Sequence, residues 1–373
     1  MERIVSVFIR ERNTKYYVYL TIEDEFKKRS QKNMGTYTNK KDAERRKREL
    51  LYLKDQNKLQ LPSEQTLENY MHEFMNSYKC NLSITTYEQY TKILTKHIYP
   101  ILGKLKLSEL QPIHLQKYVD MKINELKPQT VKIHLNVLSI ALTYAYKLRI
   151  IDDKIVDRIM IPKNNKFKNE IYTEEDLRIL FEKVKDKNIE LPIHLAVGFG
   201  LRISEILGLR WQDIDFENKV IHVRQITARV NGDVILKEPK TESSIRDLSG
   251  PQEIFEMLKK ERKKQIQKRL KGERINEELI FFDNKGNPIG EDCISQRFRR
   301  FLIKKELKQI RFHDLRHSCA SLLLKNGIGM KEIQLWLGHS NFNTTANTYS
   351  HLDYSSKLHS AMTMEKCLNY TRA

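Results

Sequence analysis

Several features that would assign a class at once are missing from this 373-residue sequence. It has no uninterrupted apolar run of about 18 residues, the length that a membrane-spanning helix needs. The N-terminus alternates apolar and polar residues and carries acidic residues early, which is unlike a signal peptide. The cysteines lie far apart with no Cys-x-x-Cys pair, at Cys80, Cys293, Cys319 and Cys367. Such spacing supports neither a disulfide framework nor a zinc knuckle, and we expect a cytoplasmic protein without membrane contact.

Enzyme signatures built on glycine are also missing. The chain has no P-loop, no Gly-x-Gly-x-x-Gly fingerprint and no Gly-x-Ser-x-Gly elbow, so nucleotide hydrolysis and acyl transfer lack their usual parts. What the chain has in excess is positive charge, with 67 Lys and Arg against 48 Asp and Glu. Residues 1–60 contribute +7 and residues 61–168 contribute +6 to the total of +19. An excess spread over the whole chain favours binding of a polyanion along its length, although a lysine-rich proteome explains the same composition.

Residues 1–58 predict a small module of three strands followed by one helix. The β-prone runs are separated by polar turns, and the helix has Thr38 or Asn39 as its cap. A basic sheet of this size fits a DNA groove, whereas a solvated sheet face is the alternative explanation. The residues that we expect to contact DNA are Arg10, Arg12, Lys28, Arg29 and Lys32.

Residues 63–162 predict an all-α bundle of four or five helices, helical to about residue 160. Apolar residues recur at three- and four-residue steps, and we expect one helix to stop at Pro100. After a second polar linker, residues 170–373 predict a mixed, mainly α domain. Its first helix is capped at Thr173, and its β-hairpin region turns at Asn231-Gly232. The predicted fold class is therefore multidomain: a small sheet with a helix, a helical bundle, and a mixed domain.

Three stretches of the last domain hold polar residues that suggest chemistry, two at helix starts and one after a glycine that ends a helix. Arg202 follows two glycines in "GFGLRISE", His313 and Arg316 stand in "HDLRH", and His339 and Tyr349 stand in "LGHSNFNTTANTYSH". Guanidinium and imidazole groups can neutralise the charge of a pentavalent phosphorane, and a tyrosine can act as the nucleophile. Each piece is weak alone, but their combination in this order predicts phosphoryl transfer.

A zinc site is the competing interpretation, because His313 and His317 have the i, i+4 spacing of a His-Glu-x-x-His motif. The neighbouring acid is Asp314 rather than a glutamate, and Arg316 would repel a dication within one helical turn. We therefore expect no metal and no other cofactor.

The order "GLRISE", "HDLRH", "LGH" and "TYSH" resembles the tyrosine recombinase family, the phage integrases, and in particular those of Gram-positive phages and conjugative transposons. The resemblance implies an arm-type DNA-binding module, a core-binding domain and a catalytic domain. Arg202 and Arg316 would clamp the scissile phosphate, with His339 as a further contact. His313 would accept the tyrosine proton or hydrogen-bond the phosphate, and Tyr349 would attack.

The resemblance also implies a lysine that protonates the leaving oxygen and an acid beside the first arginine. Lys240 stands in the family's Pro-Lys-Thr setting, with Lys237 as the alternative, and Glu205 is the matching acid. Tyr354 is the close rival of Tyr349.

The implied partners are double-stranded DNA with core and arm attachment sites, a homotetramer at synapsis, and an excisionase or DNA-bending host factor. We expect residues 359–373 to dock on a neighbouring subunit. The implied activity is metal- and ATP-independent integration or excision of a mobile element. A type IB topoisomerase and a catalytically dead DNA-binding regulator are the alternatives.

Overall fold

A computed structural model describes residues 3–23, 26–56, 65–161 and 170–342. These residues form two compact units. One contains the described residues up to Asn81 and residues 90–161, and the other contains Leu82–Gln89 and residues 170–342. Across the described ranges, no helix has both the length and the apolar character needed to cross a bilayer. The sequence predicts three modules, a finer division than these two units, and the boundaries of the modules stay a prediction.

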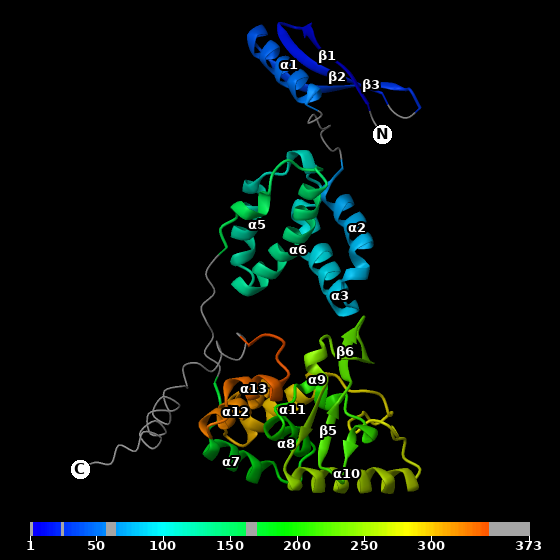
Figure 1. Ribbon diagram of the computed structural model, residues 1–373, viewed down its shortest axis with the longest axis vertical. Coiled ribbons are helices and arrows are strands. Elements are labelled where there is room, and N and C mark those ends of the chain that lie inside the picture. The colour runs from blue at the N-terminus through cyan, green and yellow to red at the C-terminus, as the bar shows by residue number, and fades with distance from the viewer. Residues whose placement is uncertain (1–2, 24–25, 57–64, 162–169, 343–373) are drawn as a thin grey trace, which may run out of the picture. The chain divides into compact units, whose positions relative to one another are not determined.

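The N-terminal residues form an antiparallel sheet covered by one helix, as Figure 1 shows. The elements are β1 (Arg3–Arg12), β2 (Lys15–Glu23), β3 (Arg29–Tyr37) and α1 (Lys40–Asp55). Asn39 caps the helix, its side chain accepting a hydrogen bond from the Lys41 N–H. Alternate residues of β2 pack in the core beneath α1, while Tyr17 and Tyr19 lie on the opposite, open face. The buried residues of this core are Val7, Val18, Leu20, Ile22, Ala43 and Leu50.

The helical segment that follows is built as predicted from apolar positions at three- and four-residue steps. Its main helices are α2 (Leu67–Tyr78), α3 (Ile84–Ile93), α4 (Tyr99–Leu102), α5 (Pro112–Ile123) and α6 (Pro128–Lys147). Pro112 and Pro128 each occupy the first position of a helix, where a missing N–H costs nothing. After α6 the chain makes only a 3₁₀ turn, Ile155–Arg158, so the expectation of helix to about residue 160 was too long.

Pro100 does not stop its helix, and that prediction was wrong. The helix runs on from α3 through a π-helical segment, Leu94–Ile98, into α4, and it ends at Gly103. Pro100 sits in the first turn of α4. A π-helical turn changes the backbone pairing just before the proline, so the chain accommodates the missing donor without breaking.

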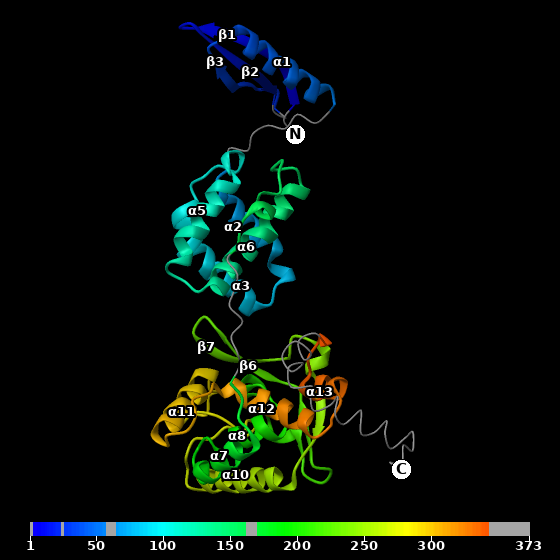
Figure 2. The same cartoon turned by 90° about the vertical axis from the view of Figure 1, so that its left-hand side faces the viewer.

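The mixed unit surrounds a large apolar core with helices and short strands, which confirms the predicted fold class. Its helices are α7 (Glu174–Val184), α8 (Glu190–Gly198), α9 (Ile203–Leu207), α10 (Gln252–Leu270), α11 (Glu291–Lys304), α12 (Phe312–Lys325) and α13 (Met330–Leu337). Thr173 caps α7 in a capping box with Asp176, as the sequence predicts. Figure 2 shows α8 and α12 in the middle of this unit, and α10 along its edge.

The strands of this unit form two separate small sheets. One has the order β4-β5-β8, with β4 (Ile214–Asp215), β5 (Val220–Val223) and β8 (Arg246–Ser249). The other is the hairpin of β6 (Ile226–Val230) and β7 (Asp233–Lys237), which projects from the unit in Figure 2. The hairpin turns at Asn231-Gly232, both with positive φ, as a two-residue turn requires.

Candidate active site

Arg202 stands at the start of α9 because the preceding backbone makes a left-handed turn. Gly200 has φ +63°, and a Cβ there would lie 2.5 Å from a methyl carbon of Leu337, so only glycine fits. The Arg202 backbone N–H and its Nη1 both donate to the Glu205 carboxylate, at 2.9 and 2.6 Å. Its Nη2 donates to the Gly338 carbonyl at 3.3 Å. The arginine is thereby oriented by α9 and by the residue that ends α13.

Glu205 is the anionic centre of the site and is 1% exposed. Arg246 donates to both of its oxygens, at 3.2 and 2.9 Å, and Arg316 Nη1 lies 3.9 Å away. Burial would raise the pKa of this carboxyl, but Arg246, Arg316 and Arg202 outweigh burial and lower the pKa to about 2. The carboxylate therefore stays charged and holds the guanidinium groups together against their mutual repulsion.

Arg316 is the most deeply buried cation of the site, with 1% of its surface exposed. Its Nη1 donates to the Gly200 carbonyl and its Nη2 to the Leu337 carbonyl, both at 2.6 Å. These carbonyls belong to the turns that lead into α9 and out of α13. A fixed arginine therefore joins the segments on which Arg202 and His339 depend.

Imidazole groups complete the cluster. The rings of His313 and His317 meet edge to face, 5.0 Å apart. His313 is an exposed residue, yet desolvation by the surrounding protein, then His317 and Arg316, lower its pKa to about 4. Desolvation, then Arg316 and Arg202, lower the pKa of His339 to about 3. Both imidazoles are therefore neutral at pH 7.

A pocket of about 320 Å³ brings three of the predicted residues together. Arg202, Lys240 and His339 line it, beside Glu205 and Thr241. Lys237 lies at the end of β7, where its Nζ donates to the Thr85 hydroxyl at 3.3 Å. The geometry thus favours Lys240 over Lys237 as the lysine of the site. Tyr349 and its rival Tyr354 lie outside the described residues.

The alternative zinc site gains no support from the described residues. Nowhere in that part of the chain do three or more His, Cys, Asp or Glu side chains gather as a metal would need. His313 and His317 instead face each other and the cations of the cluster.

Arg246 belongs to this cluster and was missed by the sequence reasoning. It lies in "SSIRDL", two positions before Leu248 in a short strand. That pattern is a weak signal, because an arginine in a strand usually faces solvent.

Comparison with known proteins agrees with the geometry. A model described as the phage integrase family matches residues 171–356, and one described as the phage integrase N-terminal SAM-like domain matches residues 66–123. The XerC-like tyrosine recombinase of Caldanaerobacter subterraneus is 29% identical over 286 residues, covering 70% of this chain and 72% of that protein. The ICEBs1 integrase of Bacillus subtilis is 27% identical, covering 71% of this chain and 73% of the relative.

Solved structures show the same fold. The Tn1549 transposon integrase in complex with a circular intermediate DNA superposes with a TM-score of 0.68 at 22% identity, covering 81% of this chain and 99% of that one. A lambda integrase dimer bound to a core site gives a TM-score of 0.57 at 18% identity, covering 92% and 94%. The fold and the site define a tyrosine recombinase. Within that class, the chain belongs to the phage integrase family.

Proposed function

We propose that this protein is a site-specific DNA recombinase that integrates or excises a mobile element through a covalent 3′-phosphotyrosyl intermediate. The observation that carries the proposal is that Arg202, Lys240 and His339 line one pocket, with the buried Arg316 near Glu205. A cluster with more guanidinium groups than carboxylates suits a phosphodiester, whose charge grows in the transition state.

The chemistry assigns one role to each group. The Tyr349 phenol oxygen attacks the scissile phosphorus while its proton passes to His313, which is neutral at pH 7. Arg202 and Arg316 stabilise the charge on the non-bridging oxygens, with His339 as a further contact. The bond to the 5′ oxygen breaks and Lys240 supplies the proton that this oxygen needs. The products are a 3′-phosphotyrosyl bond and a free 5′-hydroxyl, so the bond energy is kept for rejoining without ATP.

A nicked suicide substrate tests this proposal directly. On such DNA the cleaved fragment diffuses away, so the covalent adduct accumulates and mass spectrometry names the modified residue. We expect the adduct on Tyr349 and none from Tyr349→Phe, while Tyr354→Phe serves as the matched control and keeps the reaction. An adduct on another residue, or no adduct on a substrate that the protein binds, would contradict the proposal.

Two other functions share part of this evidence. A type IB topoisomerase would relax a supercoiled plasmid but would not join two sites, so a two-site recombination assay separates the activities. A regulator with a decayed site would bind DNA without forming the adduct. The cluster of charged side chains around Glu205 favours an active site, because a decayed site has no reason to keep buried cations.

The predicted modules would divide the work on DNA. Residues 1–58 would bind arm sites, residues 63–162 the core site, and residues 170–373 would carry out catalysis. Arg10 supports the first assignment, since its guanidinium lies over the rings of Phe8 and Tyr19 on the open face of the sheet. Of the other predicted contacts, Arg12 and Arg29 share that face by strand register, Lys28 precedes β3, and Lys32 pairs with buried Leu20 on the α1 side.

Recombination of two DNA sites would need an assembly. A lambda integrase has been solved as a tetramer bound to a Holliday junction, and we extend that state to this chain at synapsis. Residues 359–373, outside the described residues, would dock on the neighbouring subunit, and an excisionase or DNA-bending host factor would set direction. The protein would act in the cytoplasm. Unchanged assembly and recombination after deletion of residues 359–373 would refute the docking of the tail.

A further inference from the structure

Strand β8 has an arginine, Arg246, on its buried face, where an apolar residue is expected. Side chains of β8 alternate, so that Arg246 and Leu248 are buried while Asp247 and Ser249 are exposed. Arg246 is 9% exposed. A buried charge costs free energy unless it is paired and fully hydrogen-bonded. The position of Arg246 therefore needs a role that an apolar side chain cannot fill.

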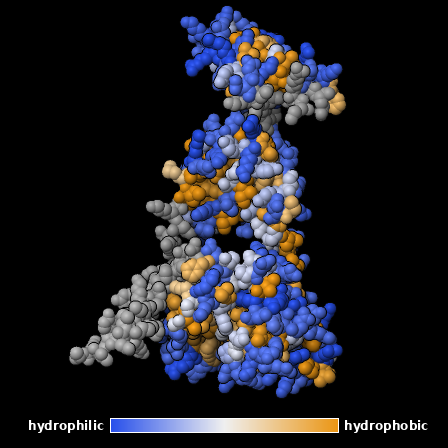
Figure 3. All heavy atoms as spheres, viewed as in Figure 1, coloured by the Kyte–Doolittle hydropathy of each residue, from blue (hydrophilic) through white to orange (hydrophobic). Residues whose placement is uncertain are grey.

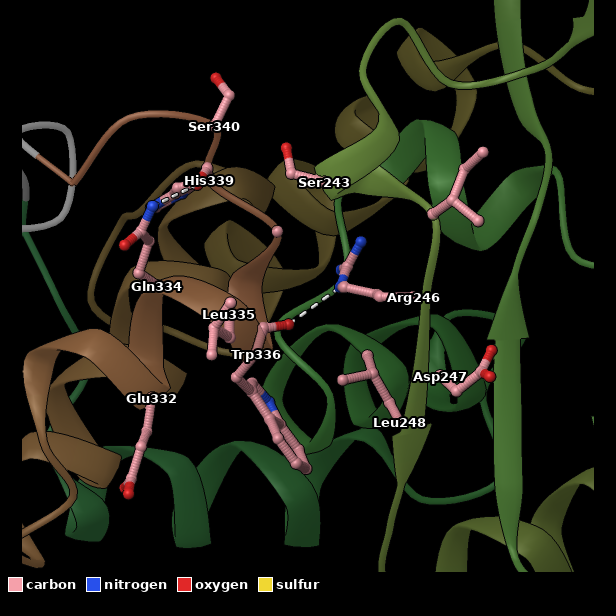
Figure 4. A pocket seen from close by; sticks show the side chains of 12 residues that line it. Ser243, Arg246, Asp247, Leu248, Glu332, Gln334, Leu335, Trp336, His339 and Ser340 are labelled. Atoms are coloured by element: carbon pink, nitrogen blue, oxygen red, sulfur yellow. Dashed lines mark hydrogen bonds between the residues drawn. The ribbon is translucent and has the colours of Figure 1, made fainter.

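The Arg246 guanidinium is bonded to three segments that surround the Lys240 pocket. Nη1 and Nη2 donate to the Glu205 carboxylate of α9. Nε donates to the Trp336 carbonyl at 2.9 Å, in the last turn of α13, which Figure 4 shows as a dashed line. Nη1 also donates to the Ser244 carbonyl at 3.1 Å. One side chain thus ties together the acid, the helix before His339, and the loop after Lys240.

Gly338 makes this junction tight. It has φ +66°, and a Cβ there would lie 2.7 Å from the Ser243 carbonyl oxygen and 3.1 Å from Arg246 Nη1. The loop, the arginine and the turn before His339 are therefore in direct contact, with no space for a side chain between them. Loss of the Arg246 hydrogen bonds would therefore separate the loop from that turn.

The loop transmits this position to Lys240 because it is a compact turn. The Ser244 N–H donates to the Thr241 carbonyl at 2.9 Å, and the Thr241 hydroxyl bonds the hydroxyls of Ser243 and Ser244 at 3.1 and 2.9 Å. Lys240 directly precedes this turn. A displacement of Ser243 and Ser244 therefore moves the start of the turn, and the lysine with it.

Arg246 does not itself line the pocket that Lys240 lines. It lines a neighbouring pocket of about 520 Å³ with Leu248 and Trp336 (Figure 4), while Gly338 and His339 border both pockets. The donor groups of Arg246 point to protein acceptors and not to the space that a phosphate would occupy.

The geometry points to Arg246 as a positioning residue, which holds the Lys240 loop against the Gly338-His339 turn so that Lys240 reaches the leaving 5′ oxygen. This inference rests on the proposed function, in which Lys240 protonates that oxygen.

The test compares two suicide substrates in single-turnover cleavage by the full-length chain. One has the natural 5′ oxygen at the scissile phosphate, and the other has sulfur in its place. When the phenol attacks the sulfur substrate, the phosphorus–sulfur bond breaks and a thiolate leaves without needing a proton. A variant that misplaces Lys240 should therefore cleave the sulfur substrate at the wild-type rate. A variant that binds the phosphate poorly should cleave both substrates slowly. Lys240→Ala calibrates the size of the rescue.

We expect Arg246→Lys, which keeps the charge but loses the fork, to cleave the oxygen substrate about 100-fold more slowly, with unchanged DNA affinity. On the sulfur substrate its rate returns to that of the wild type. Arg224→Lys is the matched control, because Arg224 also pairs with a carboxylate, Asp247, and donates to the Arg246 carbonyl. It keeps the wild-type rate on both substrates.

A wild-type rate of Arg246→Lys on oxygen, or an equal loss on both substrates, overturns the inference. Thr241→Val provides a second variant in case Arg246→Lys does not fold, because it removes the hydroxyl that bonds Ser243 and Ser244 without changing a contact of Arg202 or His339. The same loss on oxygen and rescue on sulfur are expected, and an equal loss on both substrates contradicts the inference. If the wild type forms no adduct on either substrate, the proposed function itself has failed.

Discussion

At the residue scale, the site depends on a local motif in which an arginine begins a helical turn and a carboxylate follows three residues later. In each case the arginine N–H and its guanidinium both donate to that carboxylate, which caps the turn and fixes the arginine rotamer. The pairs in the described part of the chain are Arg202–Glu205, Arg210–Asp213 and Arg311–Asp314. Glu205 differs from the other carboxylates because it also accepts from Arg246.

This difference gives a prediction for Glu205→Gln. Removing the charge leaves the buried Arg246 unpaired and removes the anion that holds Arg202, so we expect the free energy of unfolding to fall by about 3–5 kcal/mol. Both tryptophans of the chain, Trp211 and Trp336, lie in the same unit, so their fluorescence in urea reports its unfolding.

Asp213→Asn is the matched control, since Asp213 pairs with Arg210, which is 23% exposed. We expect a smaller loss of about 1–2 kcal/mol from this substitution, because the amide oxygen still accepts from the Arg210 N–H. Equal losses in the two variants would mean that Glu205 does not have the central electrostatic role that its contacts indicate.

At the scale of elements, the helical bundle contains a stacked histidine pair of which one member, His134, is buried. His134 of α6 is 1% exposed and shares a 2.8 Å hydrogen bond with the Tyr118 hydroxyl of α5. Its ring stacks on His97, with centroids 4.8 Å apart. Burial, then His97 and Lys122, lower the pKa of His134 to about 4. The bundle therefore holds this imidazole neutral near pH 7.

The lowered pKa predicts that acid weakens the bundle. The unfolded chain binds a proton near pH 6.5 and the folded chain only near pH 4, so stability is lost as pH falls between these values. The expected loss from His134 approaches about 3 kcal/mol at the lower end. NMR titration of histidine-labelled protein should find, beside the His313 ring, a second ring that titrates near pH 4 and whose signal His134→Gln removes.

His134→Gln should also flatten the pH dependence of stability, because glutamine accepts the Tyr118 hydrogen bond but does not titrate. A His134 signal that titrates near 6.5 would contradict the buried environment of this ring.

At the scale of the whole molecule, the net charge of +19 is the dominant property. Figure 3 shows hydrophilic side chains over much of the visible surface of each part, with apolar areas between them. Charge that neutralises DNA phosphates releases counterions, so the logarithm of affinity falls linearly with the logarithm of salt concentration. Binding of this protein to DNA should accordingly be steeply salt-dependent.

Single arginines should change that slope according to their contact with DNA. For the full chain on a nonspecific duplex, Arg10→Gln is expected to lower the slope by about one, the value for one phosphate contact. Arg269→Gln is the control, because Arg269 of α10 pairs with Glu277 at 3.1 Å on the mixed unit. Fluorescence anisotropy across a salt series measures both slopes. An unchanged slope for Arg10→Gln would show that Arg10 does not contact a DNA phosphate.

Much of this architecture followed from local patterns. Helix starts at Asn39, Thr173 and Arg202 depend on neighbours within a few residues, and the hairpin turn on two adjacent residues with positive φ. Such features need no distant partner, so the sequence predicts them well. Pro100 is the exception, because a π-helical turn absorbed a proline that normally ends a helix.

The ion pairs around Glu205 could be predicted only in part from the sequence. Motif order was enough to select Arg202, His313, Arg316 and His339, but it could not reveal Arg246, which lies 41 residues after its carboxylate partner. An arginine in a strand is expected at the surface, and only the contacts of Arg246 with α9 and α13 show that this one is buried. Caps, turns and motifs are determined by residues that are neighbours in the sequence. The pairing of buried charges is determined only by the tertiary structure, because it requires distant segments to meet and exclude water between them.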